Sequence, residues 1–303
     1  MWIINNREIF YGISIALVAA SVVSLAIWGL EPGIDFTGGT LVEVAYQDTR
    51  PSMDSVIPAL SAIDPAVSVR PSGSDEFFVR MKTVDQAGKE AVMNALSMNG
   101  TASTTIKSFD SVGPVLGAEA LRKAWVSVIL VILGIVLYIT FAFRKVSKPV
   151  SSWKYGLIAV SSLIHDVIIP VGAFSILGHY LGYEVDTLFV TALLVILGFS
   201  VHNTIVVFDR VRENIRLTGD REPFSDIVGK SVAQTFTRSM NTSATVVIAL
   251  VVLLILGSET TAHFTLALII GIVAGTWSSV FIGSPLLVTI EKWQSKKDKS
   301  RLR

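Results

Sequence analysis

Six long runs of apolar residues, separated by polar segments, dominate the pattern of this chain. A helix needs roughly 20 mostly apolar residues to cross a hydrocarbon core about 30 Å thick. The fifth run is short, which allows a start nearer Arg238, and Pro285 is expected to kink the sixth helix or to end its regular part. The pattern therefore predicts six transmembrane helices, at approximately 10–30, 122–143, 154–178, 188–208, 242–257 and 264–290.

The lysine and arginine residues between the runs predict which side of the membrane each segment occupies. Segments 144–154 and 210–238 and the C-terminal tail are rich in these residues, whereas the short segments 179–187 and 258–263 contain none. Because cytoplasmic segments carry the excess of positive charge, both termini are expected in the cytoplasm. The first run follows Arg7 but is longer than the core of a signal peptide, so we expect an uncleaved membrane anchor.

One longer polar segment, 31–121, has the patterns of a small α+β domain. Strands are expected where polar and apolar residues alternate, and helices where apolar residues recur every three or four positions. These rules give strands at 39–46, 67–70, 76–82 and 103–109, and helices at 52–63 and 84–98. The order β-α-β-β-α-β is that of the ferredoxin-like fold. We therefore expect a ferredoxin-like extracytoplasmic domain between the first and second transmembrane helices.

The chain is thus expected to be an α-helical polytopic membrane protein in four parts. These are a cytoplasmic N-terminus with the first helix at 1–30, the domain at 31–121, a five-helix bundle at 122–290 and a basic cytoplasmic tail at 291–303. Apolar residues make up 51% and charged residues 16% of the chain, with a mean hydropathy of +0.61, whereas soluble domains are about a quarter charged. The absence of cysteine excludes disulfides and thiolate chemistry. No motif indicates an enzyme, a metal, a cofactor or a nucleic-acid partner, and we expect none.

The glycine-rich segment 33–40, GIDFTGGT, nearly fits the phosphate-loop spacing G-x-x-x-x-G-K-T. Gly39 occupies the position of the lysine, so the side chain that would reach a phosphate is missing. The segment also leads from a membrane helix into a strand, which is the reverse of a phosphate loop. We therefore expect Gly33, Gly38 and Gly39 to permit positive φ angles, which let the chain turn sharply before the sheet begins.

The same octapeptide, which contains Gly33, Asp35, Gly38 and Gly39, resembles the motif that opens the extracytoplasmic domain of SecD and SecF proteins. Four later stretches resemble successive spans of SecF: SLIHDV from residue 162, GFSVHNTIVVFDRVREN from 198, SVAQTFTRSMNTS from 231 and GIVAGTWSS from 271. Five such stretches in this order, with a small insert, are typical of SecF and differ from SecD. The chain therefore resembles the SecF members of the SecD/SecF family, whose membrane part is half of an RND-type transporter.

This resemblance implies a function in protein export. It implies that the chain pairs with SecD into a twelve-helix unit in the lipid bilayer of the cytoplasmic (inner) membrane, beside the SecYEG channel. It also implies that the unit uses protons and the proton-motive force to promote the export of preproteins. Two alternatives are open: half of an RND-like proton-coupled pump for a small molecule or lipid, which the small insert disfavours, and a translocon assembly factor that transports nothing.

Polar side chains interrupt three of the apolar runs. His165 and Asp166 lie near the middle of the third run, His202 and Asn203 lie in the fourth, and Arg238 lies at the cytoplasmic entrance of the fifth. A polar side chain in lipid costs several kcal/mol, so these residues are expected to face partners or water. They are candidates for a proton relay. The alternative is that they form hydrogen bonds that only join the helices.

Asn203 departs from the family pattern. The resemblance implies an aspartate directly before Thr204, where SecF proteins have the carboxylate assigned to proton coupling, and this chain has asparagine there. Asparagine is nearly isosteric with aspartic acid but cannot titrate. Either the residue is a substitution that holds one conformation, or the protein naturally lacks this relay step. Both explanations predict impaired proton coupling. Asp166 and His202 remain candidate proton carriers, but the resemblance does not assign the main role to them.

Small residues in the sixth run predict close helix packing. Gly271 and Gly275 form a G-x-x-x-G pair, and Ser278 and Ser279 follow one turn later. Such residues allow two helix backbones to approach closely. The pattern fits both a static contact and a mobile one.

Overall fold

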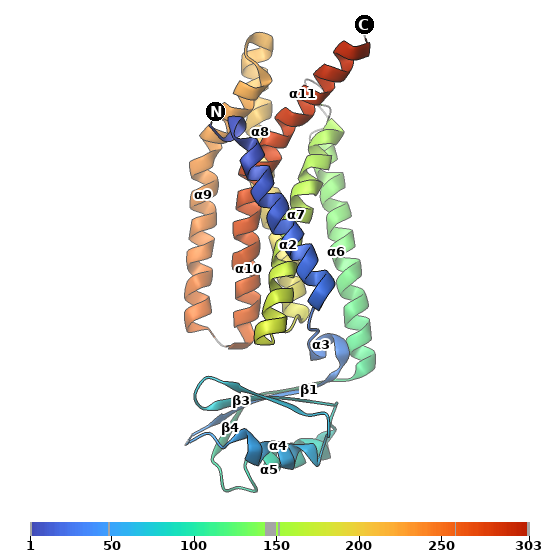
Figure 1. The fold of residues 1–303 in the computed structure, drawn as a ribbon, viewed down its shortest axis with the longest axis vertical. Helices are drawn as coiled ribbons and strands as arrows, with labels where there is room; N and C mark the ends of the chain where they lie inside the picture. The colour runs from blue at the N-terminus through green and yellow to red at the C-terminus, as the bar shows by residue number, and fades with distance from the viewer. Residues whose placement is uncertain (1, 48, 143–149, 151, 258, 302–303) are drawn as a thin grey trace. The chain divides into compact units, whose positions relative to one another are not determined.

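The computed structural model describes the chain except for residues 1, 48, 143–149, 151, 258 and 302–303 (Figure 1). It divides into two compact units. The first, Met1–Glu31 with Val126–Arg303, is called the membrane unit below, and the second, Pro32–Trp125, is called the αβ domain.

The described chain contains six helices that are long and apolar enough to cross a membrane, which confirms the predicted number. They are α2 (Arg7–Trp28), α6 (Pro114–Ala142), α7 (Ser152–Leu181), α8 (Thr187–Thr218), α9 (Phe224–Leu256) and a sixth helix in three parts, α10 (Glu259–Ser278), η2 (Ser279–Gly283) and α11 (Ser284–Arg301). A short helix, α1 (Trp2–Asn5), precedes α2. The predicted start of the fifth helix was wrong, because apolar residues mark only the lipid-embedded part and the helix begins at Phe224.

Three of these helices form the interior of the membrane unit. Half of the most apolar window is buried in α7 and in α8, and 67% is buried in the sixth helix, against 6% in α6 and 11% in α9. Large side chains such as Tyr155, Phe174 and Phe208 are fully buried in this unit. Polar side chains on the buried faces of these three helices are therefore enclosed by protein, whereas most of the apolar window of α6 and of α9 is exposed.

The sixth helix changes its winding where the kink was predicted. The regular helix α10 ends at Ser278, the π turn η2 covers Ser279–Gly283, and α11 begins one residue before Pro285. Proline is tolerated in the first turn of a helix, because its missing N–H would have no helical partner there. The Ser284 hydroxyl donates to the carbonyl oxygen of Ser279 across the π turn at 2.9 Å. The regular part of the span thus ends before Pro285, and the helix continues beyond it.

The αβ domain has the predicted element order. Its elements are β1 (Gly39–Tyr46), α4 (Met53–Ser61), β2 (Ser68–Ser72), β3 (Glu76–Met81), α5 (Gln86–Leu96) and β4 (Thr104–Val112). The four strands pair antiparallel in the order β2-β3-β1-β4. Both helices cover the same face of the sheet (Figure 1). Apolar residues from both layers form the core of the domain, among them Val42, Val44, Val56, Leu60, Phe77, Val79, Val92 and Leu96.

The segments that enter and leave the αβ domain touch at a junction that we call the neck (Gly38, Pro114 and Gly117). Gly38 has a φ angle of 74°, and a Cβ atom there would lie 2.8 Å from Pro114 Cα. A Cβ atom on Gly117 would lie 2.9 Å from the backbone nitrogen of Gly38. Gly39, with a φ angle of 129°, starts β1, so two glycines of this loop have the expected positive φ. A side chain at Gly38 or Gly117 would push the two segments apart.

A short helix, α3 (Ile34–Thr37), lies between the end of α2 and the neck and was not predicted. Gly33 adopts an extended conformation at its N-cap, which corrects the positive φ expected there, and the Gly33 carbonyl oxygen accepts from Thr37 N at 3.1 Å and from Thr37 Oγ1 at 3.0 Å. Asp35 lies in the first turn, where a carboxylate favours the positive end of the helix dipole. The motif residues thus build a compact turn that leads into β1.

Candidate functional site

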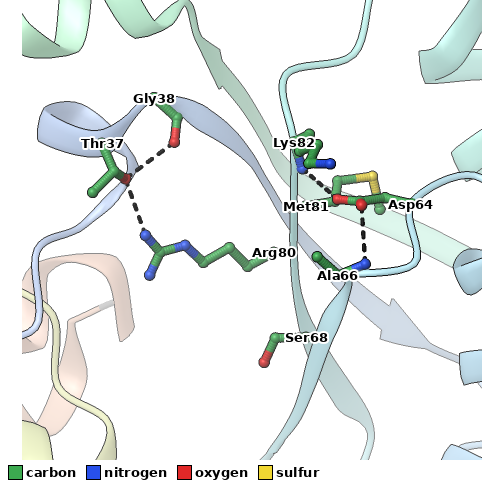
Figure 2. Close-up of a pocket in the computed structure, with 8 residues that line it drawn as sticks. All are labelled: Thr37, Gly38, Asp64, Ala66, Ser68, Arg80, Met81 and Lys82. Carbon is green, nitrogen blue, oxygen red and sulfur yellow. Dashed lines mark hydrogen bonds between the residues drawn. The ribbon is translucent and has the colours of Figure 1, made fainter.

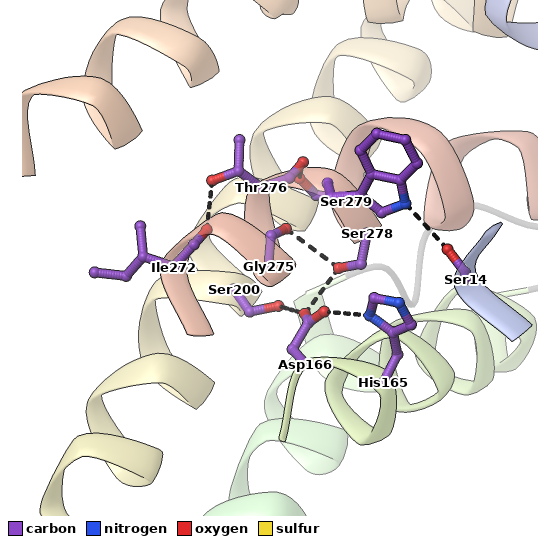
Figure 3. A network of polar contacts seen from close by, with 10 residues as sticks. Ser14, His165, Asp166, Ser200, Ile272, Gly275, Thr276, Ser278 and Ser279 are labelled. Atoms are coloured by element: carbon purple, nitrogen blue, oxygen red, sulfur yellow. Dashed lines mark hydrogen bonds and ion pairs between the residues drawn. The ribbon is translucent and has the colours of Figure 1, made fainter. Parts of the chain in front are cut away.

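Asp166 lies at the centre of α7 and is completely buried. Its Oδ2 atom accepts hydrogen bonds from the hydroxyls of Ser278 on α10, at 2.8 Å, and of Ser200 on α8. Its Oδ1 atom lies 2.8 Å from Nδ1 of the neighbouring His165 (Figure 3). Three interior helices therefore meet at one carboxylate.

Small residues on α10 make this meeting possible. A Cβ atom on Gly275 would lie 3.2 Å from Ser200 Cβ and 3.5 Å from Asp166 Oδ2. A Cβ atom on Gly271 would lie 2.2 Å from Ile196 Cδ1, so α10 and α8 are in very close contact there. Both glycines predicted to pack closely thus lie against α8, and the approach allows hydroxyls from two helices to reach Asp166.

Hydrogen-bond partners surround the Asp166 carboxyl group. A buried carboxylate is stable only where hydrogen-bond donors replace its lost hydration, and the two serine hydroxyls are such donors. His165 is mostly buried, and its imidazole can accept or return a proton at the 2.8 Å separation between Nδ1 and Oδ1. Among the described residues, no cluster of three or more acidic or histidine side chains could hold a metal ion.

Several polar atoms buried on α7 and α8 lack a hydrogen-bond partner in the described structure, on both sides of Asp166. In the described structure, Ser162 Oγ, Asn203 Nδ2 and Thr204 Oγ1 are buried without a hydrogen-bond partner. Ser162 precedes Asp166 by one turn of α7, and Thr204 follows Ser200 by one turn of α8. Because α7 and α8 are antiparallel, both positions lie on the side of Asp166 nearer the chain termini (Figure 1). Buried polar atoms of this kind often bind ordered water.

The other predicted relay residues do not join the hydrogen bonds of Asp166. Asn203 is buried, with 2% of its surface exposed, one turn beyond Ser200 on α8. His202 lies on the exterior of the membrane unit, and Arg238 on α9 is exposed as well. The structure thus brings His165 and Asp166 together, leaves Asn203 nearby, and separates His202 and Arg238 from the buried carboxyl group.

Sequence reasoning missed two partners of Asp166. Ser200 was not considered, and Ser278 was assigned only to helix packing. A signal for Ser200 exists in the sequence, since Ser200, Asn203 and Thr204 are spaced by three and four residues and share one face of α8. For Ser278, serine next to a G-x-x-x-G pair fits close packing equally well, so its bond to Asp166 depends on how three helices meet.

A small pocket in the αβ domain is lined by eight residues, among them Asp64 and Arg80, which form hydrogen bonds within the domain (Figure 2). Asp64 accepts from the backbone N–H groups of Lys82, at 2.7 Å, and Ala66, at 3.0 Å, and these bonds hold the pKa of Asp64 below its ordinary value. The Arg80 guanidinium donates to Thr37 Oγ1 at 3.0 Å. These contacts tie β3 to the loops beside it, and they explain the pocket as a structural feature.

Two family models match this chain. The model of the SecD/SecF GG motif matches residues 23–49, and the model of the protein export membrane protein SecD/SecF, C-terminal, matches residues 91–293. The chain belongs to the SecD/SecF family. The matched GG-motif segment includes Gly38 of the neck and Gly39 at the start of β1. Gly38 lies where the segment that enters the αβ domain contacts the segment that leaves it.

Relatives over nearly the whole length are SecF proteins. The protein translocase subunit SecF of Thermobaculum terrenum is 40% identical, and that of Anaerolinea thermophila is 35% identical; in both cases the match covers 97% of this chain and 94% of the relative. The resemblance inferred from the sequence is therefore confirmed.

Solved structures of SecDF share this fold. The crystal structure of SecDF from Thermus thermophilus, described as a translocon-associated membrane protein, superposes with a TM-score of 0.80 and 26% identity over 95% of this chain. A SecDF structure in a super-membrane-facing form gives a TM-score of 0.70 with 26% identity over 98% of this chain. The chain spans 38% and 40% of those longer chains, respectively.

Proposed function

We propose that this chain is the SecF-type subunit of a Sec translocon and that it couples the proton-motive force to protein export together with SecD. The observation that carries the proposal is Asp166, a carboxyl group buried among three interior helices and bonded to His165, Ser200 and Ser278. A titratable group at this depth is costly for a membrane protein, and such groups commonly mark proton pathways. The SecF relatives support the export role.

In the proposed cycle, Asp166 alternates between a charged and a neutral form. The charged form accepts from both serine hydroxyls and holds α8 and α10 against α7. Protonation removes the charge and weakens those bonds, because a charged acceptor forms stronger hydrogen bonds than a neutral one. His165 exchanges the proton with Asp166, and the polar atoms of Ser162 and Thr204 line the route toward the cytoplasm. No enzymatic step and no cofactor belongs to this cycle.

The proposed orientation places both termini in the cytoplasm and the αβ domain outside the inner membrane. The lysines and arginines of the short connecting segments support this orientation. In that arrangement the αβ domain is available to exported preproteins, and the membrane unit lies beside the SecYEG channel.

The proposed SecD partner covers a polar part of the bundle surface. His202 on α8 and Arg238 on α9 are exposed in this chain, close to or within the spans. Polar side chains there are unfavourable against lipid and favourable against a partner helix. The SecDF chains that share the fold are much longer, which leaves room for a SecD portion beside a region like this one.

Complementation tests the proposal. Cells depleted of their own SecF would receive this chain with a SecD from the same source, and export of a reporter preprotein would be followed with and without a protonophore. We expect export to recover and to fall again when the gradient is removed. If export recovers equally with and without the protonophore, proton coupling would be excluded. Failure to recover, with the SecD complex assembled and membrane-inserted, would contradict the export role.

A scaffold function is the second candidate, and Asn203 supports it. The family resemblance places a titrating carboxyl group at this position, and an asparagine cannot carry a proton. A chain that assembles the translocon without driving transport would restore export equally with and without the gradient. The protonophore arm of the complementation experiment therefore separates the two candidates.

A further inference from the structure

Neighbouring residues at the end of α10 connect Asp166 with α2. Ser278 donates to Asp166 Oδ2 at 2.8 Å, and the preceding residue, Trp277, donates from Nε1 to the hydroxyl of Ser14 on α2 at 3.0 Å (Figure 3). Ser14 is buried and Trp277 is partly buried in the described structure, so this bond lies between the two helices. A displacement of the α10 end therefore acts on α7 and α2 together.

Aromatic rings strengthen the connection to α2. Phe10 of α2 stacks on Phe281 of the π turn with ring centroids 4.6 Å apart, and Phe281 lies 4.5 Å from Trp277. Phe10 and Trp277 also meet edge to face at 5.7 Å. Aromatic pairs of this kind stabilise a contact beyond the effect of the area they bury. The three rings and the bond to Ser14 hold α2 against the junction of α10 and η2.

The π turn η2 is a place where the end of α10 can change its conformation. A π turn contains one residue more than an α-helical turn, and such turns often occur at functional sites. η2 starts at Ser279, directly after the residue that binds Asp166, and carries Phe281. A change in the hydrogen bond between Ser278 and Asp166 can therefore be absorbed by the π turn and appear as a movement of Trp277 and Phe281.

We infer that Trp277 is a positioning residue that transmits the state of Asp166 to α2. The inference rests on the proposed function and names the route by which proton uptake at Asp166 reaches the chain segment leading into the αβ domain. α2 ends at Trp28, and the αβ domain begins at Pro32, so only three residues separate the two. A shift of α2 is thus delivered directly to that domain.

The titratable groups around this route are few in the described structure. From α7, His165 contacts Asp166; from α8 and α10, the groups that contact it are the hydroxyls of Ser200 and Ser278. Ser14, the α2 partner of Trp277, does not titrate in the accessible pH range. A pH response of Trp277 that disappears in Asp166→Asn therefore reports on the pair of Asp166 and His165.

Fluorine NMR tests the inference without altering the fold. The full chain, labelled with 5-fluorotryptophan and bound to SecD in lipid nanodiscs, would give one resonance for Trp277, identified by its loss in Trp277→Phe. We expect this resonance to shift with pH, and the shift to be lost in Asp166→Asn. An unshifted Trp277 resonance in a complex whose export depends on the gradient would overturn the inference and leave the proposed function intact. Gradient-independent export would overturn the proposed function and, with it, the inference that rests on it.

An export assay with matched variants provides a second test. Ser14→Ala removes the acceptor of Trp277, whereas Ser24→Ala removes a different buried hydroxyl of α2, which donates to the Gly172 carbonyl oxygen at 3.1 Å. A hydrogen bond contributes about 1 kcal/mol, so its loss changes an equilibrium constant by about fivefold. We expect about a fivefold loss of gradient-dependent export in Ser14→Ala and little change in Ser24→Ala. Equal losses in both variants would indicate a structural role only.

A double-mutant cycle completes the test. If Trp277 acts through Ser14, the double variant Ser14→Ala with Trp277→Phe should export as well as the more impaired single variant. Additive losses would show that the two side chains act separately, and would overturn the route through this hydrogen bond.

Discussion

Ser278 Oγ lies 2.8 Å from Asp166 Oδ2, and this hydrogen bond joins the end of α10 to the centre of α7. It lies one residue before the π turn of the sixth helix. The bond therefore links the one buried carboxyl group contacted by three interior helices of the described chain to the place where the sixth helix changes its winding. A substitution of Asp166 is therefore expected to change the contact between α7 and α10 as well.

Replacing Asp166 with asparagine should remove the gradient dependence of export. The asparagine side chain could keep a hydrogen bond to a serine hydroxyl but could not change charge. Coupling between two sites typically changes the affinity at one of them by about 5–150-fold. We therefore expect protonophore-sensitive export to fall by at least about fivefold. The assay is reporter export at matched protein levels.

Asp209→Asn is the matched control for that variant. Asp209 lies beyond the middle of α8, toward its C-terminal end, is more than half exposed, and pairs with Arg212 at 2.5 Å. Exposed ion pairs contribute little to stability. Export should stay near that of the unmodified chain. A similar loss in both variants would mean that Asp166 has no special role in coupling.

Replacing Asn203 with aspartic acid should raise gradient-dependent export. The amide nitrogen of Asn203 is buried without a hydrogen-bond partner in the described structure, so the position can accept a carboxyl group of nearly the same shape. The new group could titrate beside the route lined by Thr204. Protonophore-sensitive export of both chains should be compared. Equal export would show that this position carries no essential proton.

Replacing Gly172 with alanine should separate α2 from α7. A Cβ atom on Gly172 would lie 2.2 Å from Ser21 Cβ and 2.4 Å from Ser21 Cα, and a backbone atom cannot turn away as a flexible side chain can. Overpacking of this kind costs about 1–3 kcal/mol. The variant should unfold at a lower temperature in detergent.

Gly198→Ala tests the specificity of that effect. Gly198 lies inside α8, and a Cβ atom there would meet no described atom within 4 Å. Alanine favours a helix by about 1 kcal/mol over glycine, so this variant should be as stable as the unmodified chain or slightly more stable. Equal destabilisation of both variants would contradict the close contact between α2 and α7.

The αβ domain should lose stability in acid through Asp64. Hydrogen bonds from the N–H groups of Lys82 and Ala66 lower the pKa of Asp64 in the folded domain. A lowered pKa stabilises the fold above the unfolded value, near about 3.9, and this contribution is lost as the pH falls through the folded value. Below about pH 4, the unmodified domain should therefore lose stability more steeply than Asp64→Asn.

Thermal unfolding of the full chain at several pH values would measure this difference. The chain has no cysteine, so a fluorophore on Glu90→Cys, an exposed position of α5, would report on the αβ domain alone. Parallel pH profiles for the chain with Asp64 and with Asp64→Asn would contradict the prediction.

The pattern of apolar residues in the sequence predicted most of the fold. The long apolar runs predicted all six spans, because a helix in lipid needs about 20 apolar residues, and the alternation of polar and apolar residues predicted the four strands, because only one face of the sheet is buried. The apolar runs did not predict where the helices begin and end. α9 begins at Phe224, where polar residues continue the helix outside the apolar run, and hydropathy does not detect that part.

The site was predicted only in part, for a physical reason. His165 and Asp166 stood out because ionisable residues are rare in apolar runs. Ser200 and Ser278 did not, since serine is tolerated in membrane helices of every kind. Their contact with Asp166 depends on the close approach of three helices at Gly275, a relationship between segments far apart in the chain.

The neck determines how force enters the αβ domain. Gly38 belongs to the incoming segment, while Pro114 and Gly117 belong to the outgoing one, and their backbones are in direct contact. Tension on either segment is therefore shared by both at this point, before it reaches the sheet.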